Sequence, residues 1–230
     1  KEGLTDVIAK ATGRVAVTCF ASNIARIDSI CRAAVANGRS VAVVGRALNR
    51  AISAAREVGY LADLPDLVPE GDVDLLPRDS IVVVCTGTQG EPRAAMARIA
   101  AASHDSISLE AGDTVIYSSR QIPGNEKAIA RVQDMLVRRE IKLVTDQEAP
   151  VHVSGHPSRD EMMEMYRLIR PKIAIPVHGT ARHLLAHASL AAGCQVGQTV
   201  LPDNGAMIRL SGEKAEVVGN FHTGALTSEK

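Results

Sequence analysis

The sequence contains no tryptophan, and aromatic residues make up only 2% of its 230 residues. Proteins that hold single strands of nucleic acid on stacking platforms need several aromatic rings along one groove, so this class of binder is excluded. Charge of either sign is not in excess, because 26 Lys and Arg balance 26 Asp and Glu. Without an overall basic field, any binding of a polyanion must use local loops or patches.

Cysteine is also scarce, and the four residues are far apart in the chain, at Cys19, Cys31, Cys85 and Cys194. No CxxC pair occurs, and Cys19 and Cys85 lie inside apolar runs, so we expect buried, reduced thiols. No apolar run reaches the ~18 residues of a membrane span, and the first residues do not resemble a signal peptide. We therefore expect a cytoplasmic protein that does not contact a membrane. Because the chain begins at Lys1 and ends at Lys230, we interpret it as a piece of a longer protein.

The first 147 residues alternate between apolar runs typical of strands and helical segments. Strands are expected at 14–20, 40–45, 80–85, 113–118 and 142–145, with helices at 22–37 and 48–58 and further helices ending near 102 and 139. The Pro- and Asp-rich segment 61–77 is expected to be a loop with at most a short strand. Continuous apolar strands that alternate with helices predict an α/β fold, in which helices cover both faces of a parallel sheet.

The pattern changes near Asp146. A polar loop at His152–His156 precedes an expected helix at 159–169, a strand at 172–177 that ends on His178, and a helix at 181–192. Two short strands near 199–201 and 206–210, followed by a hairpin, complete the chain. These features predict a domain boundary near residue 150.

Four loops lie where a ligand site is expected, because ligands bind at the carboxyl ends of parallel strands. The loops at 20–23, 86–91, 118–125 and 152–156 offer hydroxyls, amides or backbone N–H groups beside a helix start. Such a position suits a phosphate. Ordinary turn and capping chemistry would explain each loop taken alone. Segment 86–91 (TGTQGE) lacks the Gly-Lys-Ser/Thr ending of a Walker A motif and is not a dinucleotide fingerprint, so neither ATP nor NAD is indicated.

Histidines provide a second signal, because five of the seven fall between residues 152 and 187. His178 ends an expected strand, a position that can fix an imidazole as a metal ligand. His183 and His187 share one helix face, and without an HExxH pattern we favour a packing or surface role for them. A zinc site needs three or four protein ligands, and the sequence has no HxHxDH-like cluster. If His178 binds a metal, its partner ligands lie outside this chain.

Five segments taken together carry a family resemblance. They are 20–23 (FASN), 85–92 (CTGTQGEP), 122–126 (IPGNE), 152–156 (HVSGH) and 175–179 (IPVHG). In this order they resemble the β-CASP metallo-β-lactamase ribonucleases, and in particular the ribonuclease J family. The resemblance implies a β-CASP domain over residues 1–150 and the C-terminal part of a metallo-β-lactamase αββα domain over 151–218. Residues 219–230 would then be a linker towards a further domain.

The resemblance also implies a role for individual residues. His178 matches the last histidine ligand of a centre of two Zn²⁺ ions, and His156 matches a catalytic histidine beside the scissile phosphate. The remaining matches are substrate-binding residues. They comprise the terminal-nucleotide loop of Ala21, Ser22 and Asn23, the phosphate-gripping loop of His152, Val153, Ser154, Gly155 and His156, and, as weaker candidates, Gln89 and Glu91.

The implied parent enzyme is a zinc-dependent ribonuclease with 5′-to-3′ exonuclease and endonuclease activity. Its partner would be RNA, as 5′-monophosphorylated single strands, and its assembly a homodimer or homotetramer. The half that carries the HxHxDH motif is absent from this chain. One departure is Thr180, which stands where the family has Glu after the His-Gly pair. It leaves any role for that position open.

Other classes of protein remain compatible with these residues. One is a non-catalytic module that binds RNA ends and is inactive by itself. Another is a small-molecule α/β enzyme, such as a phosphotransferase or a sugar-phosphate binder, and a third is a structural assembly surface. Zinc content separates the first class from an intact catalytic site, and a comparison of mononucleotide with sugar-phosphate binding separates the second.

Overall fold

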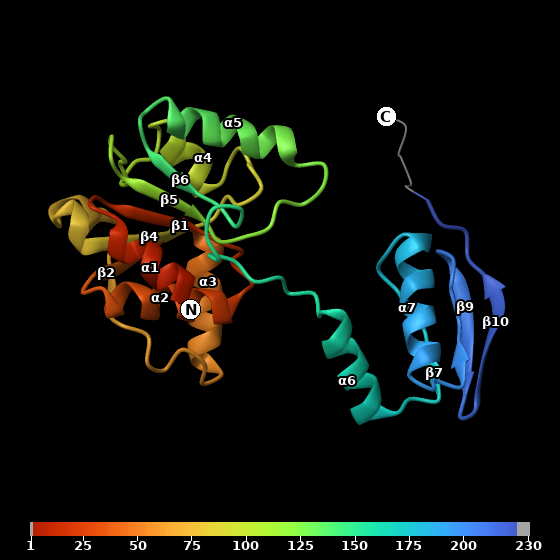
Figure 1. Ribbon diagram of the computed structural model, residues 1–230. Coiled ribbons are helices and arrows are strands. Elements are labelled where there is room, and N and C mark those ends of the chain that lie inside the picture. The colour runs from red at the N-terminus through yellow and green to blue at the C-terminus, as the bar shows by residue number, and fades with distance from the viewer. Residues whose placement is uncertain (1, 225–230) are drawn as a thin grey trace. The chain divides into compact units, whose positions relative to one another are not determined.

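The computed structural model describes residues 2–224, which form two compact units that divide between Ser154 and Gly155 (Figure 1). The first unit is built on a six-stranded sheet in the order β3-β2-β4-β1-β5-β6, and every neighbouring pair is parallel. The strands are β1 Val15–Thr18, β2 Ser40–Val44, β3 Leu67–Val68, β4 Ile81–Cys85, β5 Thr114–Tyr117 and β6 Lys142–Val144. The predicted α/β fold and its five expected strands are confirmed, and the short β3 lies in the expected loop.

Helices cover both faces of this sheet, as the continuous apolar strands predict. On one face, α1 Glu2–Lys10, α2 Ile24–Ala36 and α3 Arg46–Glu57 bury residues such as Ile8, Ile27 and Leu48. On the other face, α4 Ala95–Ala100 and α5 Glu126–Val137 bury Met96 and Leu136 (Figure 1). Two 3₁₀ turns, η1 Glu70–Leu75 and η2 Arg78–Ser80, precede β4.

A buried ionic network lies beside the amino ends of β1 and β5. The guanidinium of Arg14, a residue only 1% exposed, pairs with Asp74 and donates to the carbonyl oxygens of Ser108 (2.8 Å) and Val73 (3.1 Å). Asp113, 2% exposed, accepts from the backbone N–H of Arg14 at 2.8 Å and pairs with Arg78. Arg14 and Asp113 are buried, whereas the side chains of their partners Asp74 and Arg78 are 51% and 28% exposed, so losing either partner would leave a buried charge uncompensated.

The second unit is smaller and less regular. Its elements are α6 Arg159–Ile169, β7 Ile173–Ala174, α7 Ala181–Gly193, β8 Gln198–Thr199, β9 Ala206–Ser211 and β10 Lys214–Asn220. The β7 and β8 strands pair in parallel, and β9 and β10 form the expected hairpin. The strand expected at 172–177 is only two residues long, because it pairs over Ile173 and Ala174 and Pro176 has no N–H to donate.

The buried cluster in the second unit consists of Ala174, Ala191 and Val196, and the partly buried Tyr166 packs against it. Larger apolar side chains such as Leu168 (71% exposed) and Leu210 (65%) remain on its surface. Of the expected linker 219–230, residues 225–230 lie outside the described part of the chain. Among the described helices, none is long and apolar enough to cross a bilayer.

Candidate functional site

The first candidate loop, 20–23, is fixed by the start of α2. The side-chain oxygen of Asn23 accepts the backbone N–H of Arg26 at 3.0 Å and so caps the helix. This contact uses the amide oxygen of Asn23 and leaves its amide NH₂ as a donor. Ser22 and Asn23 are both exposed, whereas Ala21 is half-buried. The loop therefore presents a hydroxyl and an amide beside the amino end of a helix, where an anion is favoured.

Arg26 connects this loop to the segment that begins at Val151. Its Nη1 donates to the carbonyl oxygen of Val151 at 3.4 Å, and its Nη2 donates to that of Val153 at 3.5 Å. From β5, the hydroxyl of Ser118 donates to the same Val151 oxygen at 2.6 Å. The structure thus brings the loop at 20–23, the end of β5 and residues 151–153 together, as the sheet-edge argument predicts for the first unit.

His152 lies within this cluster as a neutral imidazole at pH 7. Burial lowers the pKa of His152, and the positive charge of Arg26 lowers it further. The Nδ1 atom of His152 is buried and has no hydrogen-bond partner among the described residues. Burial also lowers the pKa of the Arg26 guanidinium, which nevertheless stays charged at any physiological pH. The cluster therefore presents a half-buried positive charge beside a neutral histidine, which suits a phosphate.

Gln89, a weaker candidate, uses its side chain for hydrogen bonds within the protein. Its Nε2 donates to Thr88 Oγ1 (3.2 Å) and to the Arg120 carbonyl (3.1 Å), while its Oε1 accepts from Ile122 N (2.9 Å) and Asn125 Nδ2 (3.2 Å). The side chain is 6% exposed, so it braces loop 86–91 against loop 118–125.

The same loop is held close to α5. A Cβ at Gly90, which has a φ of +74°, would lie 2.4 to 2.7 Å from backbone atoms of Ala128 and Ile129. Only glycine allows this approach. Glu91, the other weaker candidate, is exposed, and its carboxylate accepts the backbone N–H of Gln89 at 2.9 Å.

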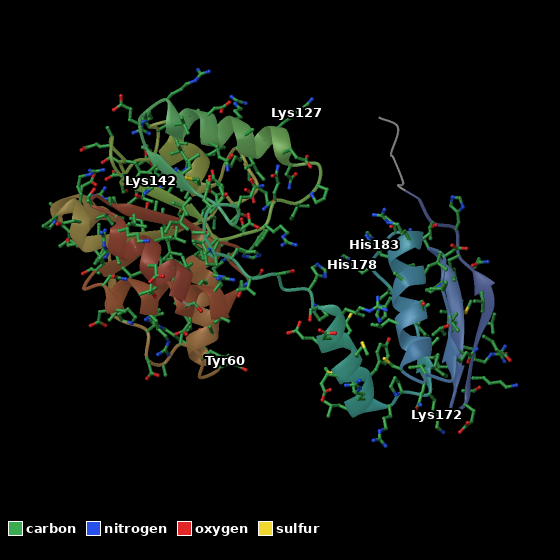
Figure 2. The ribbon with its side chains drawn as sticks, in the orientation of Figure 1. Tyr60, Lys127, Lys142, Lys172, His178 and His183 are labelled. Atoms are coloured by element: carbon green, nitrogen blue, oxygen red, sulfur yellow. The ribbon has the colours of Figure 1, made fainter. Side chains whose placement is uncertain are left out.

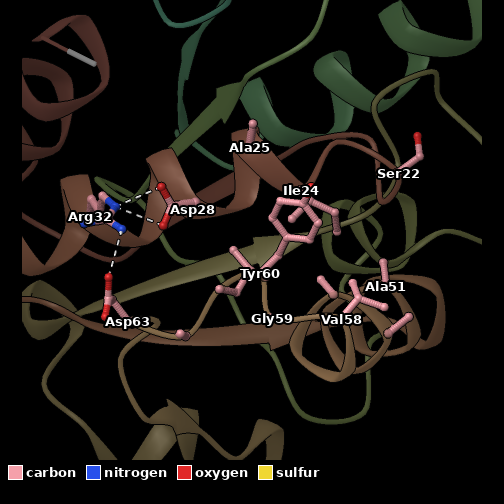
Figure 3. A pocket seen from close by; sticks show the side chains of 14 residues that line it. Ser22, Ile24, Ala25, Asp28, Arg32, Ala51, Val58, Gly59, Tyr60 and Asp63 are labelled. Carbon is pink, nitrogen blue, oxygen red and sulfur yellow. Dashed lines mark hydrogen bonds and ion pairs between the residues drawn. The ribbon is translucent and has the colours of Figure 1, made fainter.

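Beside Ser22 lies an apolar groove of about 860 Å³ between α2 and the end of α3 (Figure 3). Tyr60, 67% exposed, stands next to Ile24 in this groove. The arginine in its wall is already neutralised, because Arg32 Nε contacts both oxygens of Asp28 at 2.8 and 2.9 Å and Asp63 lies 3.9 Å from Nη2. The groove therefore does not supply the charge that a phosphate needs, whereas Arg26 does.

Of the remaining candidates, Ser154 is the last residue of the first unit, and Gly155, His156 and His178 belong to the second. Gly155 and His156 are exposed in the loop before α6, and Ser158 and Glu161 form a capping box at the start of that helix. The loop is therefore anchored by its helix. Figure 2 shows His178 and His183 near the amino end of α7.

His178 is exposed and has a φ of +63°, in the left-handed region that non-glycine residues rarely occupy. Five other non-glycine residues also have a positive φ, and histidine enters this region more readily than most residues, so this conformation does not by itself mark a site. Within residues 2–224, no group of three or more His, Cys, Asp or Glu side chains is arranged to hold a metal ion. The described residues alone therefore bring together too few donors for a zinc site.

The other residues near His178 have structural roles. Thr180 is the cap residue of α7, and its backbone N–H and hydroxyl lie 3.3 and 3.1 Å from His183 Nδ1. A capping role explains why a threonine fits at this position. His187 Nε2 lies 2.8 Å from the Tyr166 hydroxyl, with the rings packed edge to face. The packing or surface role expected for His183 and His187 is thus confirmed.

Comparison with known protein families identifies both parts of the chain. Residues 12–136 match the family model described as the ribonuclease J β-CASP domain. The chain belongs to the ribonuclease J family. Residues 147–198 match a second model, described as the RNA specificity domain of Zn-dependent metallo-hydrolases.

Individual relatives agree with the family models. The chain is 47% identical to ribonuclease J of Sinorhizobium meliloti over 94% of its own length, and 44% identical to ribonuclease J of Mycolicibacterium smegmatis over 96%. It is 35% identical to ribonuclease J2 of Bacillus subtilis over 93% of its length. The chain spans only 38 to 40% of the length of these relatives.

Sequence reasoning missed two residues of the cluster around Val151. Arg26 was not singled out, because a lone arginine in a helix is typical of a solvated surface. Its position three residues after the cap Asn23 was the available signal. Ser118 was included only as part of a loop, although its hydroxyl fixes the position of Val151. Its neighbours along β5 gave no indication of that contact.

Proposed function

We propose that this chain is the RNA-holding part of a zinc-dependent ribonuclease that works on 5′-monophosphorylated single strands. The parent enzyme acts both as a 5′-to-3′ exonuclease and as an endonuclease. Residues 1–150 make up its β-CASP domain, residues 151–218 are the C-terminal part of its metallo-β-lactamase domain, and residues 219–230 lead towards a further domain.

One observation carries this proposal: Arg26 joins the loop at 20–23 to the segment at 151–153. In the proposed complex, the exposed Ser22 hydroxyl and the Asn23 amide donate to the terminal nucleotide. The Arg26 guanidinium, beside the neutral His152, pairs with its phosphate. Charge-assisted bonds of this kind are about twice as strong as neutral ones, so a terminal phosphate dianion gains more than an internal phosphodiester.

The resemblance assigns roles to four further residues. Ser154 and Gly155 continue the phosphate-gripping loop, and His156 is the catalytic histidine that steadies charge at the scissile phosphate. His178 supplies one zinc ligand, and the others belong to the rest of the longer protein. The chain alone therefore binds RNA ends without cutting them.

The full-length protein tests this proposal. With 5′-monophosphorylated RNA and zinc, we expect mononucleotides to be released from the 5′ end, together with longer products from internal cuts. The 230-residue chain is expected to release neither and to retain almost no zinc after purification. The exonuclease proposal fails if the full-length protein releases no mononucleotides, and activity of the chain alone would contradict the assignment of the missing ligands.

Two further properties remain predictions. We expect a cytoplasmic protein, since Cys19, Cys31, Cys85 and Cys194 are all free thiols. Assembly of the full-length enzyme into a homodimer or homotetramer is expected from the resemblance alone.

A further inference from the structure

Besides the apolar groove beside Ser22, the first unit contains a separate cavity with a polar lining. It has a volume of about 260 Å³ and is lined by the ends of β5 and β6, the face of α5 and the turn at 145–148. Thr88 and Ser119, both at least 95% buried, contribute hydroxyls, and Gln133 contributes an amide. The proposed phosphate site does not use this cavity.

Tyr117 lines the cavity with a hydroxyl that lacks a partner. The residue is 4% exposed, and its hydroxyl oxygen is buried without a hydrogen-bond partner among the described residues. Burial raises the pKa of this phenol, so it remains a neutral group that can both donate and accept. A buried hydroxyl is rarely left unpaired in a native protein, which points to a partner that binds from the cavity.

The charges around the cavity restrict what this partner can be. No Lys or Arg is among its lining residues, whereas Asp146 and Glu148 are. Glu148 uses Oε2 to accept from the backbone N–H (2.6 Å) and hydroxyl (2.7 Å) of Thr145. Its second oxygen is not engaged by either contact. Arg120 Nε lies 3.9 Å from Asp146, so Glu148 carries the less compensated charge. A phosphate is thus disfavoured, and a group that presents N–H donors is favoured.

We propose that this cavity binds one base of the RNA substrate, and that it prefers guanine. The Watson–Crick edge of guanine carries two adjacent N–H donors, which suit a carboxylate, and an acceptor oxygen, which suits the Tyr117 hydroxyl. Unstacked bases in single strands are recognised along this edge. The inference rests on the proposed function, because the cavity shares Thr88 and Ser119 with the loops at 86–91 and 118–125 that flank the phosphate site.

Nucleosides without a phosphate test this cavity separately from the phosphate site. We expect guanosine to bind the 230-residue chain in a calorimetric or NMR titration, with adenosine and uridine binding at least fivefold more weakly. Inosine lacks the exocyclic amine of guanosine, so it should bind roughly fivefold to tenfold more weakly than guanosine, which corresponds to the loss of one hydrogen bond. Tyr117→Phe and Glu148→Gln should each weaken guanosine binding by a similar factor. Tyr60→Phe, which removes an exposed phenol outside the cavity, should leave it unchanged.

Folding controls keep the result interpretable. Tyr117→Phe is expected to unfold at the same or a higher urea concentration, because it removes an unpaired buried hydroxyl. The inference is overturned if guanosine does not bind or if all nucleosides bind equally. It is also overturned if the polycation spermidine displaces guanosine, since the carboxylates would then bind positive charge in general. Unchanged affinity of Tyr117→Phe for guanosine would overturn it as well. If guanosine fails while the chain still prefers 5′-monophosphorylated RNA, only this inference falls. Loss of that preference with guanosine binding intact would instead contradict the proposed function.

Discussion

Replacing Arg26 by alanine is expected to weaken the binding of 5′-monophosphorylated RNA to this chain by roughly 10- to 100-fold. The side chain is a half-buried cation that donates to the carbonyl oxygens of Val151 and Val153, while the backbone N–H of Arg26 contacts Asn23. Its loss removes a charge-assisted contact and also loosens the two segments. Fluorescence anisotropy with a labelled RNA oligomer measures the effect.

Arg32→Ala is the matched control, since it removes the same charge from the same helix. Arg32 is paired with Asp28 and lies outside the cluster, so the expected loss is below about twofold. Arg26→Lys keeps the charge but not the forked geometry, and it should fall between the wild type and Arg26→Ala. Equal losses for Arg26→Ala and Arg32→Ala would mean that RNA binds through general charge, and the assignment of Arg26 would be wrong.

Asp113→Ala is expected to lower the free energy of unfolding by about 3 kcal/mol. Asp113 is 2% exposed and accepts the backbone N–H groups of Arg14 (2.8 Å) and Glu110 (2.7 Å) as well as pairing with Arg78. We take the lower end of the range for buried pairs, because the Arg78 side chain is 28% exposed and partly screened.

Urea unfolding followed by circular dichroism measures this difference. Asp134→Ala is a suitable control, because Asp134 lies on the exposed face of α5, and it should change the free energy by less than about 0.5 kcal/mol. A shift for Asp113→Ala no larger than that of the control would show that the network at the amino edge of the sheet does not support the fold.

The sheet of the first unit was predictable because its strands are buried on both faces. Segments such as 81–85 (IVVVC) are continuous β-branched runs, and such runs are typical of parallel strands covered on both sides. Helix α1 was not expected, because residues 2–10 are few and bury only Leu4 and Ile8 deeply. Short amphipathic segments become helical through tertiary packing, which a single sequence does not display.

The candidate site was predictable as a set of loops but not as a set of contacts. Strand order brings the loops at 20–23, 86–91 and 118–125 to one edge, as the sheet argument requires. The Gln89 side chain is held inside the protein by hydrogen bonds to four residues, Thr88, Arg120, Ile122 and Asn125. Three of these lie more than 30 residues away in the chain. Similarly, only the fold reveals that Arg26 contacts Val151 and Val153, which lie 125 and 127 positions further along the chain.

The most direct test of the central claim compares one RNA oligomer with two different 5′ ends. Titrated into the 230-residue chain at a fixed salt concentration, the oligomer with a 5′-monophosphate should bind at least tenfold more tightly than the same oligomer with a 5′-hydroxyl. The difference should disappear in Arg26→Ala. Equal affinities of the wild-type chain for the two oligomers would contradict the claim that this part of the enzyme holds the phosphorylated RNA end.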